Sequence, residues 1–367
     1  MTLPQKLSPP PLPKGFFTSQ EAEEAREKEK ILMAAVFLYP ECSNDCVFCC
    51  YSKKREVKET LKPEEYTLLL KEISELGVKT VFVPGMGEPF LRERGKFFLN
   101  FSRTANEYGM YVVVPSNLNP TPTAEFIREL HTLDVSVIGK LESMIPEVLT
   151  KLTQPKIPYD LVKVDEGHIT KGLSLLMEAG FNAENRLGCG TCLNTLNAEE
   201  AENIFRFYRR NNIFPYMQDT APFGKALENP WLWEGLNYSE IFERLKRIDR
   251  EEFGFEWEMK GHYVAFDFSY PMVYIEYDGT IRYNNYFLVD MGKVKDDEEY
   301  KKGYLKEVVN SKFSSTLRKI HFPRGKDPDC CLSDHSKCKK ILLKPEDGMI
   351  ELTEEPNKYC IYHSHCE

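Results

Sequence analysis

Between residues 31 and 217 the sequence alternates short apolar runs with segments of helical periodicity. The first run, residues 31–38, is continuous and stops before Pro40, which is typical of a strand buried on both faces. Strands that alternate with helices predict a parallel sheet with helical crossovers. Six such units are too few for a closed eight-stranded barrel, so we expect an open, partial (β/α)6 barrel. The expected strands are 31–38, 80–83, 110–114, 135–138, 186–189 and 213–217, and the expected helices begin at 63, 97, 124, 169 and 198.

The segments on either side of this alternation have a different character. Residues 1–30 contain a proline run and a charged, helical stretch, and we treat them as an N-terminal extension. After residue 225 the alternation stops. A helix is expected at 238–248 and a β-hairpin at 272–287, because Asp278-Gly279 supplies the positive φ of a tight turn. The predicted organisation is therefore an extension (1–30), a barrel (31–225) and a smaller cysteine-rich α+β extension (226–367).

The charge balance narrows the class of protein. Lys and Arg total 48 against 57 for Asp and Glu, a formal charge of -9, which disfavours nucleic acid as a partner. No apolar run is long enough to cross a bilayer, and the N-terminus lacks the layout of a secretory signal. We therefore expect a cytoplasmic protein with no membrane partner.

The 11 cysteines fall into three groups, and in a reducing compartment such groups indicate metal ligands or catalytic thiols before disulfides. Cys42, Cys46 and Cys49 directly follow the first expected strand, at the spacing C-x3-C-x2-C. Three thiolates at this spacing can surround one iron–sulfur cubane and bind three of its irons, which leaves the fourth iron open for reaction. Zinc is the alternative, although it commonly takes a fourth ligand from a second paired motif. Cys50 lies outside this spacing and is expected to be a buried thiol.

This cysteine loop resembles that of the radical S-adenosylmethionine (SAM) superfamily, C-x3-C-x-aromatic-C, with Phe48 in the aromatic position. The resemblance implies a partial (β/α)6 barrel and a [4Fe–4S] cluster held by Cys42, Cys46 and Cys49. It also implies that SAM, bound at the open iron, is cleaved to a 5′-deoxyadenosyl radical that abstracts hydrogen from a substrate. An electron donor such as flavodoxin or ferredoxin would be required.

A second motif, Gly85-Met86-Gly87-Glu88-Pro89, ends the second expected strand. It resembles the superfamily's Gly-Gly-Glu-Pro element, which binds the methionine amino group of SAM, with Met86 in place of a glycine. Glycines allow a close backbone approach, and the carboxylate of Glu88 offers a counter-charge to the ammonium. Without the preceding cysteine loop, an ordinary turn would explain these residues equally well.

Further SAM contacts follow from the resemblance at the later strand ends. Ser116 and Asn117 are candidates for the SAM carboxylate or ribose, with an Asx-type turn as the alternative. Lys140 could pair with the SAM carboxylate and Glu142 with the ribose hydroxyls, while a solvated ion pair is the alternative for Glu142.

The fifth and sixth strands carry the candidates for adenine. Gly188 lies in a segment resembling the glycine-containing element that packs against adenine, and Met217 lies where the family's backbone pairs with the adenine edge. Cys189 and Cys192 form a C-x-x-C, but alternation along a strand places them on opposite faces. We therefore favour ordinary packing of these thiols over joint ligation of a metal.

The C-terminal part resembles, at residues 273–293, the hairpin that opens SPASM or twitch extensions, which hold auxiliary iron–sulfur clusters. It is a degenerate match, because Asn284 stands where that pattern has a cysteine. The tail cysteines could hold a second [4Fe–4S] cluster or a zinc ion, or they could be plain buried thiols. These candidate ligands are Cys330, Cys331, Cys338, Cys360 and Cys366.

The function expected from the resemblance is a radical SAM enzyme acting on a peptide or a small molecule. One alternative is a metal-stabilised binding or regulatory protein that keeps the barrel without cleaving SAM. Another is an RNA-modifying radical SAM enzyme, which the acidic charge disfavours. The reaction after hydrogen abstraction stays open, because members of one fold diverge at that step.

Overall fold

A computed structural model of the chain describes residues 8–50, 59–84, 87–220, 224–256, 272–282, 290–296, 299–311, 314, 340–344 and 349–353. Three groups of predictions lie outside these residues. They are the SAM contact Gly85, the hairpin position Asn284 and the tail cysteines Cys330, Cys331, Cys338, Cys360 and Cys366.

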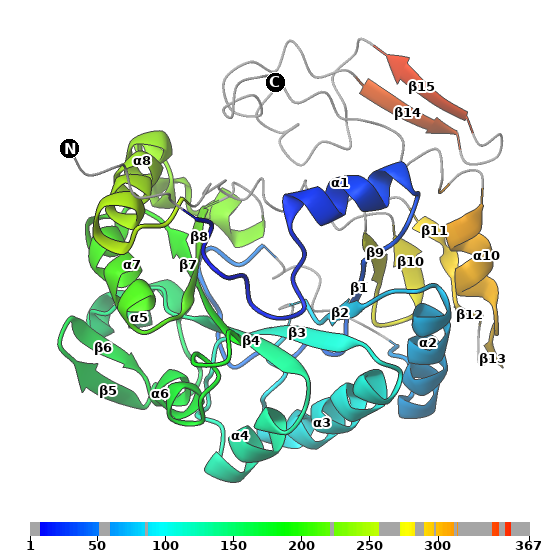
Figure 1. Cartoon of the computed structure of the whole chain (residues 1–367), viewed down its shortest axis with the longest axis horizontal. Coiled ribbons are helices and arrows are strands. Elements are labelled where there is room, and N and C mark those ends of the chain that lie inside the picture. Colours follow the sequence, from blue (N-terminus) through cyan, green and yellow to red (C-terminus); the bar gives the residue numbers. More distant parts are fainter. Residues whose placement is uncertain are drawn as a thin grey trace.

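A curved sheet of nine strands organises the barrel, with helices along its outer side (Figure 1). Six neighbouring strands pair in parallel and in chain order along the sheet, which confirms the predicted partial barrel. Because the strands are parallel, their C-terminal ends lie at one rim, and the loops that follow them meet there. The six strands are β1 (Met33–Val36), β2 (Thr80–Phe82), β3 (Tyr111–Ser116), β4 (Val135–Lys140), β7 (Leu187–Leu193) and β8 (Phe214–Asp219).

The helices begin where the sequence supplies helix-starting residues. The Oγ1 atoms of Thr123 and Thr170 accept hydrogen bonds from the first turns of α4 and α6, and Pro63 is the first residue of α2. The helices between the barrel strands are α2 (Pro63–Glu75), α3 (Arg92–Glu107), α4 (Ala124–His131), α5 (Pro146–Thr153), α6 (Lys171–Glu178) and α7 (Ala201–Arg210). The other helical segments are α1 (Ser19–Glu27), η2 (Ala198–Glu200), η3 (Gly224–Glu228), η4 (Pro230–Leu232), α8 (Tyr238–Ile248), η5 (Asp249–Phe253) and α10 (Tyr304–Asn310).

The crossover between β4 and β7 contains elements that the periodicity did not predict. They are α5 and an antiparallel hairpin of β5 (Leu161–Val164) and β6 (Gly167–Thr170). The strands β5 and β6 have four residues each, too few for an apolar period to be recognised, whereas α5 is as long as α4 and α6 and was missed although Pro146 marks its start. This insertion matters for the site, because Pro155, just after α5, forms a β-bridge with Asn44 in the cysteine loop.

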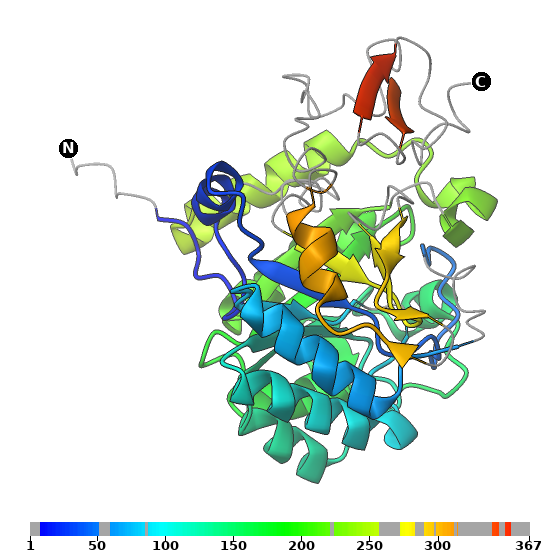
Figure 2. The same ribbon diagram turned by 90° about the vertical axis from the view of Figure 1, so that its right-hand side faces the viewer.

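The first strands of the C-terminal segment extend the same sheet. β9 (Met272–Ile275) pairs in parallel with β1, and β10 (Thr280–Arg282) and β11 (Asp290–Lys293) follow it in antiparallel order. The predicted turn at Asp278-Gly279 is present, with φ 84° at Gly279. Figure 2 shows these strands and α10 beside the barrel. The remaining strands are β12 (Lys295–Asp296), β13 (Glu299–Tyr300), β14 (Lys340–Lys344) and β15 (Met349–Thr353). The domain boundary near residue 225 stays a prediction.

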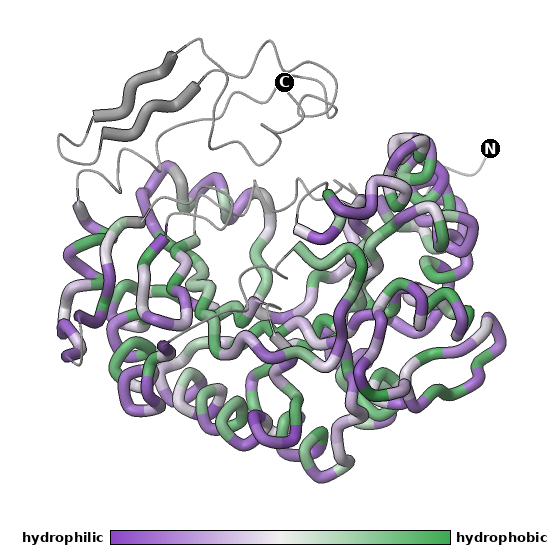
Figure 3. The backbone as a smooth tube through the Cα atoms, turned by 180° about the vertical axis from the view of Figure 1, so that it is seen from behind, coloured by the Kyte–Doolittle hydropathy of each residue, from purple (hydrophilic) through white to green (hydrophobic). Residues whose placement is uncertain are grey.

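The main hydrophobic core lies between the sheet and the helices that cover it. Leu69 and Ile73 of α2 and Phe98 of α3 are completely buried there, together with Val81 and Val112 of the strands. Each such side chain contributes about 1.5–3 kcal/mol by burial. Figure 3 shows the resulting contrast between hydrophobic strands and helices of mixed polarity. None of the helices among the described residues is both long and apolar enough to span a bilayer.

Candidate functional site

The cysteine loop after β1 is held in place by backbone hydrogen bonds to the last residues of α5 and to the segment that follows it. Within the loop, Cys49 N donates to Cys46 O at 3.1 Å, so the chain turns between these two cysteines. The loop conformation is therefore set by the protein itself and does not depend on a bound group alone. The hydrogen bonds to the α5 segment are Asp45 N to Thr153 O (3.1 Å), Val47 N to Leu152 O (3.0 Å) and Lys156 N to Ser43 O (2.8 Å).

The three thiols of this loop share one environment. Burial raises the pKa of Cys46 well above its usual value, and the charges of Cys49, Glu142 and Cys42 raise it further. Cys46 thus lies near both other cysteines and near the end of β4. Among the described residues, no three His, Cys, Asp or Glu side chains converge on a single ion position. A cubane does not need such convergence, because each thiolate binds a different iron.

The loop after β2 packs directly against the cysteine loop. Glu88 N donates to Glu41 O at 2.7 Å. A Cβ added to Gly87 would lie 2.5 Å from both Glu41 O and Tyr39 O, so only glycine permits this approach. Pro89 is buried beside Glu88. A glycine is therefore required at position 87 by the close packing of these two loops.

The carboxylate of Glu88 joins the ends of β2 and β3. Oε1 accepts hydrogen bonds from Ser116 Oγ (2.6 Å) and Phe90 N (3.0 Å), and Oε2 accepts one from Asn117 N (2.7 Å). Burial raises the pKa of Glu88 to about 7, although these three donors act in the opposite direction. A carboxylate offers about four acceptor positions, so about one is left for a ligand. The predicted contacts of Glu88 and Ser116 with SAM stay predictions.

Asn117 connects the end of β3 to the cysteine loop. Its Nδ2 lies 3.4 Å from Cys42 Sγ and 3.2 Å from Ser43 Oγ, and its Oδ1 accepts a hydrogen bond from Asn119 N at 2.8 Å. Asn119 in turn donates to Asn44 Oδ1 at 3.1 Å. The sequence interpretation missed Ser43, Asn44 and Asn119 as supports of the site. The one signal available was that Ser43 and Asn44 are small polar residues lying inside the cysteine motif.

On the far side of the rim, Lys140 and Glu142 form an ion pair, with Lys140 Nζ 3.2 Å from Glu142 Oε1. The side chain of Glu142 is only 3% exposed, so the solvated ion pair considered as its alternative does not apply. Its Oε2 also accepts a hydrogen bond from Cys192 N at 2.6 Å. Burial opposes the charge on Lys140, but Glu142, Cys192 and Cys46 together outweigh this effect and raise the pKa of Lys140. Lys140 is therefore a permanent cation at this rim.

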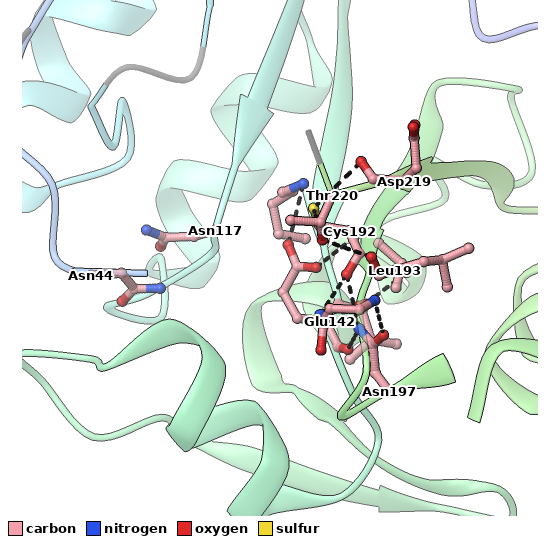
Figure 4. Close-up of polar contacts among 12 residues, drawn as sticks. Asn44, Asn117, Glu142, Cys192, Leu193, Asn197, Asp219 and Thr220 are labelled. Carbon is pink, nitrogen blue, oxygen red and sulfur yellow. Dashed lines mark hydrogen bonds and ion pairs between the residues drawn. The ribbon is translucent and has the colours of Figure 1, made fainter. Parts of the chain in front are cut away.

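Cys192 lies beside this ion pair, at the end of β7. Its Sγ is 3.3 Å from Thr220 Oγ1 and 3.9 Å from Asp219 O, while Cys189 is fully buried among the residues of the main core. The two cysteines thus face opposite sides of the strand, as alternation predicts. Figure 4 shows Glu142, Cys192, Asp219 and Thr220 together on one side of the rim, with Asn44 and Asn117 on the other. Asn197, which sequence patterns did not indicate, donates to Glu142 O at 2.7 Å.

Residues 36–208, which span all of these groups up to β7 and α7, match the family model of the Radical SAM superfamily. The chain contains a radical SAM domain. The protein is accordingly a radical SAM enzyme, and the cofactors that this family implies are a [4Fe–4S] cluster and SAM. No curated protein matches the chain.

Solved structures of low sequence identity share the fold of this radical SAM enzyme. SuiB of Streptococcus suis bound to S-adenosylmethionine is 14% identical, with a TM-score of 0.57 over 85% of this chain and 73% of SuiB. SuiB bound to its precursor peptide SuiA is 14% identical, with a TM-score of 0.55 over 86% and 72%. The protein anSMEcpe with bound AdoMet is 11% identical, with a TM-score of 0.51 over 76% and 84%. At these identities the likeness concerns the fold.

The residues of the radical SAM domain fit the cluster by the chemistry of their donors. The cysteine loop offers soft thiols as candidate ligands, and the amide of Asn117 directs an N–H donor toward the sulfur of Cys42. A thiolate bound to iron would accept that hydrogen bond. For SAM, the fit lies in the partly exposed Lys140, whose side chain is 32% exposed and whose charge suits a carboxylate.

The two adenine candidates are less open than the rest of the site. A Cβ added to Gly188 would lie 2.7 Å from Ile138 Cδ1, so a neighbouring side chain already occupies this space. Met217 is 5% exposed and packs in the main core, which leaves only its backbone to face a ligand. A Cβ added to Gly190, two residues after Gly188, would lie 3.0 Å from Lys140 Nζ. The assignments of Gly188 and Met217 to adenine stay predictions.

Proposed function

We propose that this radical SAM enzyme cleaves SAM reductively and uses the resulting 5′-deoxyadenosyl radical on a peptide substrate. The observation that carries the proposal is the meeting of three separate loops at one rim of the barrel. Cys46 of the first loop is close enough to Glu142 and Lys140 for their charges to act on its thiol. The loop of Glu88 contacts the first loop through its backbone.

Each part of the rim has a task in this proposal. Cys42, Cys46 and Cys49 would hold the cluster, which supplies one electron to break the carbon–sulfur bond of SAM and leave methionine and the radical. Lys140 would orient the SAM carboxylate, since its positive charge persists across the physiological pH range. Glu142, held in place by Cys192 N, would accept hydrogen bonds from the ribose hydroxyls.

The choice of a peptide substrate is supported by one structural relative. SuiB, which shares the fold, has been solved bound to its precursor peptide SuiA. A small-molecule substrate is the competing outcome of any substrate screen. We expect the enzyme to work in the cytoplasm with flavodoxin or ferredoxin as its electron donor, as the resemblance of the cysteine loop implied.

The test is anaerobic reconstitution with iron and sulfide, followed by dithionite and SAM, with 5′-deoxyadenosine measured by mass spectrometry. The wild type should turn brown and form 5′-deoxyadenosine, whereas Cys46→Ala should form no 5′-deoxyadenosine and should lose the cluster signal that responds to SAM. Cys189→Ala is the control, because it removes a fully buried thiol outside the loop and should keep the product. A colourless wild type that binds only zinc, or a loaded wild type that forms no 5′-deoxyadenosine, would overturn the proposal.

A further inference from the structure

We propose that Asn117 is a positioning residue for the cluster, because its side-chain amide donates a hydrogen bond to the sulfur of Cys42. This inference rests on the proposed function, in which Cys42 is a cluster ligand. It assigns Asn117 to the cysteine loop, whereas the resemblance had suggested the carboxylate or ribose of SAM. The key contact joins Asn117 Nδ2 and Cys42 Sγ at 3.4 Å.

The orientation of the Asn117 amide follows from its other contacts. Its oxygen accepts a hydrogen bond from the backbone N–H of Asn119 at 2.8 Å, and a backbone N–H can only donate. The NH2 end of the amide must therefore face the opposite way, toward Cys42 Sγ, while Ser43 Oγ lies within reach of both ends, 3.2 Å from Nδ2 and 3.3 Å from Oδ1. Turning the amide over would place two donors against each other at Asn119 and leave an oxygen against the sulfur.

The backbone of Asn117 is held as firmly as its side chain. Its N–H donates to Oε2 of the buried Glu88 at 2.7 Å, and Glu88 Oε1 accepts from Ser116 Oγ at 2.6 Å. The hydroxyl of Ser116 also accepts a hydrogen bond from Leu118 N at 3.0 Å. Glu88 thus places the donor of Asn117 through the strand end between them. The loop is tied from another direction by Lys156, whose Nζ donates to Cys42 O at 3.0 Å.

A donor at this position has a defined effect on a bound cluster. Hydrogen bonds to the sulfurs are one of the factors that set the reduction potential of iron–sulfur clusters. The reduced cluster carries one more negative charge than the oxidised cluster, so a donor stabilises the reduced state more. Loss of the donor should therefore make the potential more negative. Hydrogen bonds to charged groups are about twice as strong as those between neutral groups, and we expect about half of this strength to differ between the two states.

The experiment is an EPR-monitored redox titration of the reconstituted, SAM-free enzyme. Asn117→Ala should lower the reduction equilibrium constant about tenfold, which is ~59 mV for one electron. Asn117→Asp keeps the shape and the acceptor for Asn119 N but has no donor, so its potential should fall at least as far. Asn119→Ala is the matched control, since it loosens the same loop without touching the Asn117 side-chain amide, and its potential should match the wild type.

The possible results separate this inference from the proposed function. A wild type without a cluster means that the proposed function fails, independently of Asn117. Wild-type potentials in both Asn117 variants would overturn the inference, and so would a wild-type potential in Asn117→Asp alone, because the acceptor would then be the part that matters. An equal shift in Asn119→Ala, or cluster loss in all three variants, would also overturn it by assigning the effect to loop structure. Cluster loss confined to the two Asn117 variants would support the contact.

Discussion

Replacing Gly87 by alanine tests the contact between the two loops on which the proposed site depends. A Cβ at this position would lie 2.5 Å from two backbone oxygens, those of Glu41 and Tyr39. Carbon and oxygen atoms in close contact are ordinarily about 3.3–3.6 Å apart. The loops must therefore separate by roughly 0.8 Å, because backbone atoms cannot rotate away as side chains can. This movement would strain the 2.7 Å hydrogen bond from Glu88 N to Glu41 O.

The expected loss of stability combines three terms. Overpacking costs about 1–3 kcal/mol. The weakened hydrogen bond between backbone groups costs up to about 1 kcal/mol more. Alanine also lowers the conformational entropy of the unfolded chain, which offsets about 0.4–1 kcal/mol of this loss of stability. We therefore expect the free energy of unfolding of Gly87→Ala to fall by about 2 kcal/mol, within a range of about 0–3.6 kcal/mol, and SAM affinity to fall at least about tenfold through displacement of the loop.

Two assays check this prediction, namely denaturant unfolding of the apoprotein and equilibrium dialysis of SAM against the anaerobically reconstituted enzyme. Gly95→Ala in α3 is the control, because its Cβ meets only the ring of Phe126, at 3.0 Å, and a ring can move. Alanine is also about 1 kcal/mol better than glycine within a helix, so this control should be close to neutral. The reasoning is refuted if Gly87→Ala is as stable as Gly95→Ala and binds SAM with wild-type affinity.

Two further predictions concern a buried carboxylate and the tail. The pKa of Glu88 is raised by burial to about 7 from 4.5, so the stability linked to this group is complete below pH 4.5 and is lost as pH rises through 7. The free energy of unfolding of the wild type, minus that of Glu88→Gln, should fall by up to about 3 kcal/mol between pH 4.5 and pH 8, whereas a constant difference would contradict burial as the cause. For the tail, a second cluster predicts about eight irons per chain, and the triple Ala variant of Cys42, Cys46 and Cys49 should keep half of them. If that variant binds one zinc instead, the tail site is structural zinc, and if it binds no metal, the tail cysteines are ordinary thiols.

Much of the barrel could be predicted because the relevant signals are local. The continuous apolar run before Pro40 predicted β1, and Pro63 marked the start of α2 at the residue where it begins. The cysteine loop was placed at a strand end for the same reason, since its motif directly follows that run. The strands of the β5–β6 hairpin carry too few residues for a period and were not predicted, while α5, which is as long as α4 and α6, was missed for no reason of length.

The tertiary structure determined which residues distant in sequence contact each other at the site. Asn117 and Cys42 are 75 residues apart in sequence, and their contact depends on β3 and β1 ending at the same rim. No local pattern indicated that the carboxylate of Glu88 would face Ser116 and the backbone of Asn117, because side-chain partners across strands depend on register.

The position of β9 also separates what the sequence predicts from what the tertiary structure determines. The turn at Gly279 was visible in the sequence, since only local backbone geometry was needed to predict it. That β9 would lie parallel to β1, across more than half of the chain, was not visible. The unpaired backbone groups along the edge of β1 can be satisfied by any strand that reaches them, so the sequence of β1 determined that a partner was needed and the folded chain determined which strand it would be.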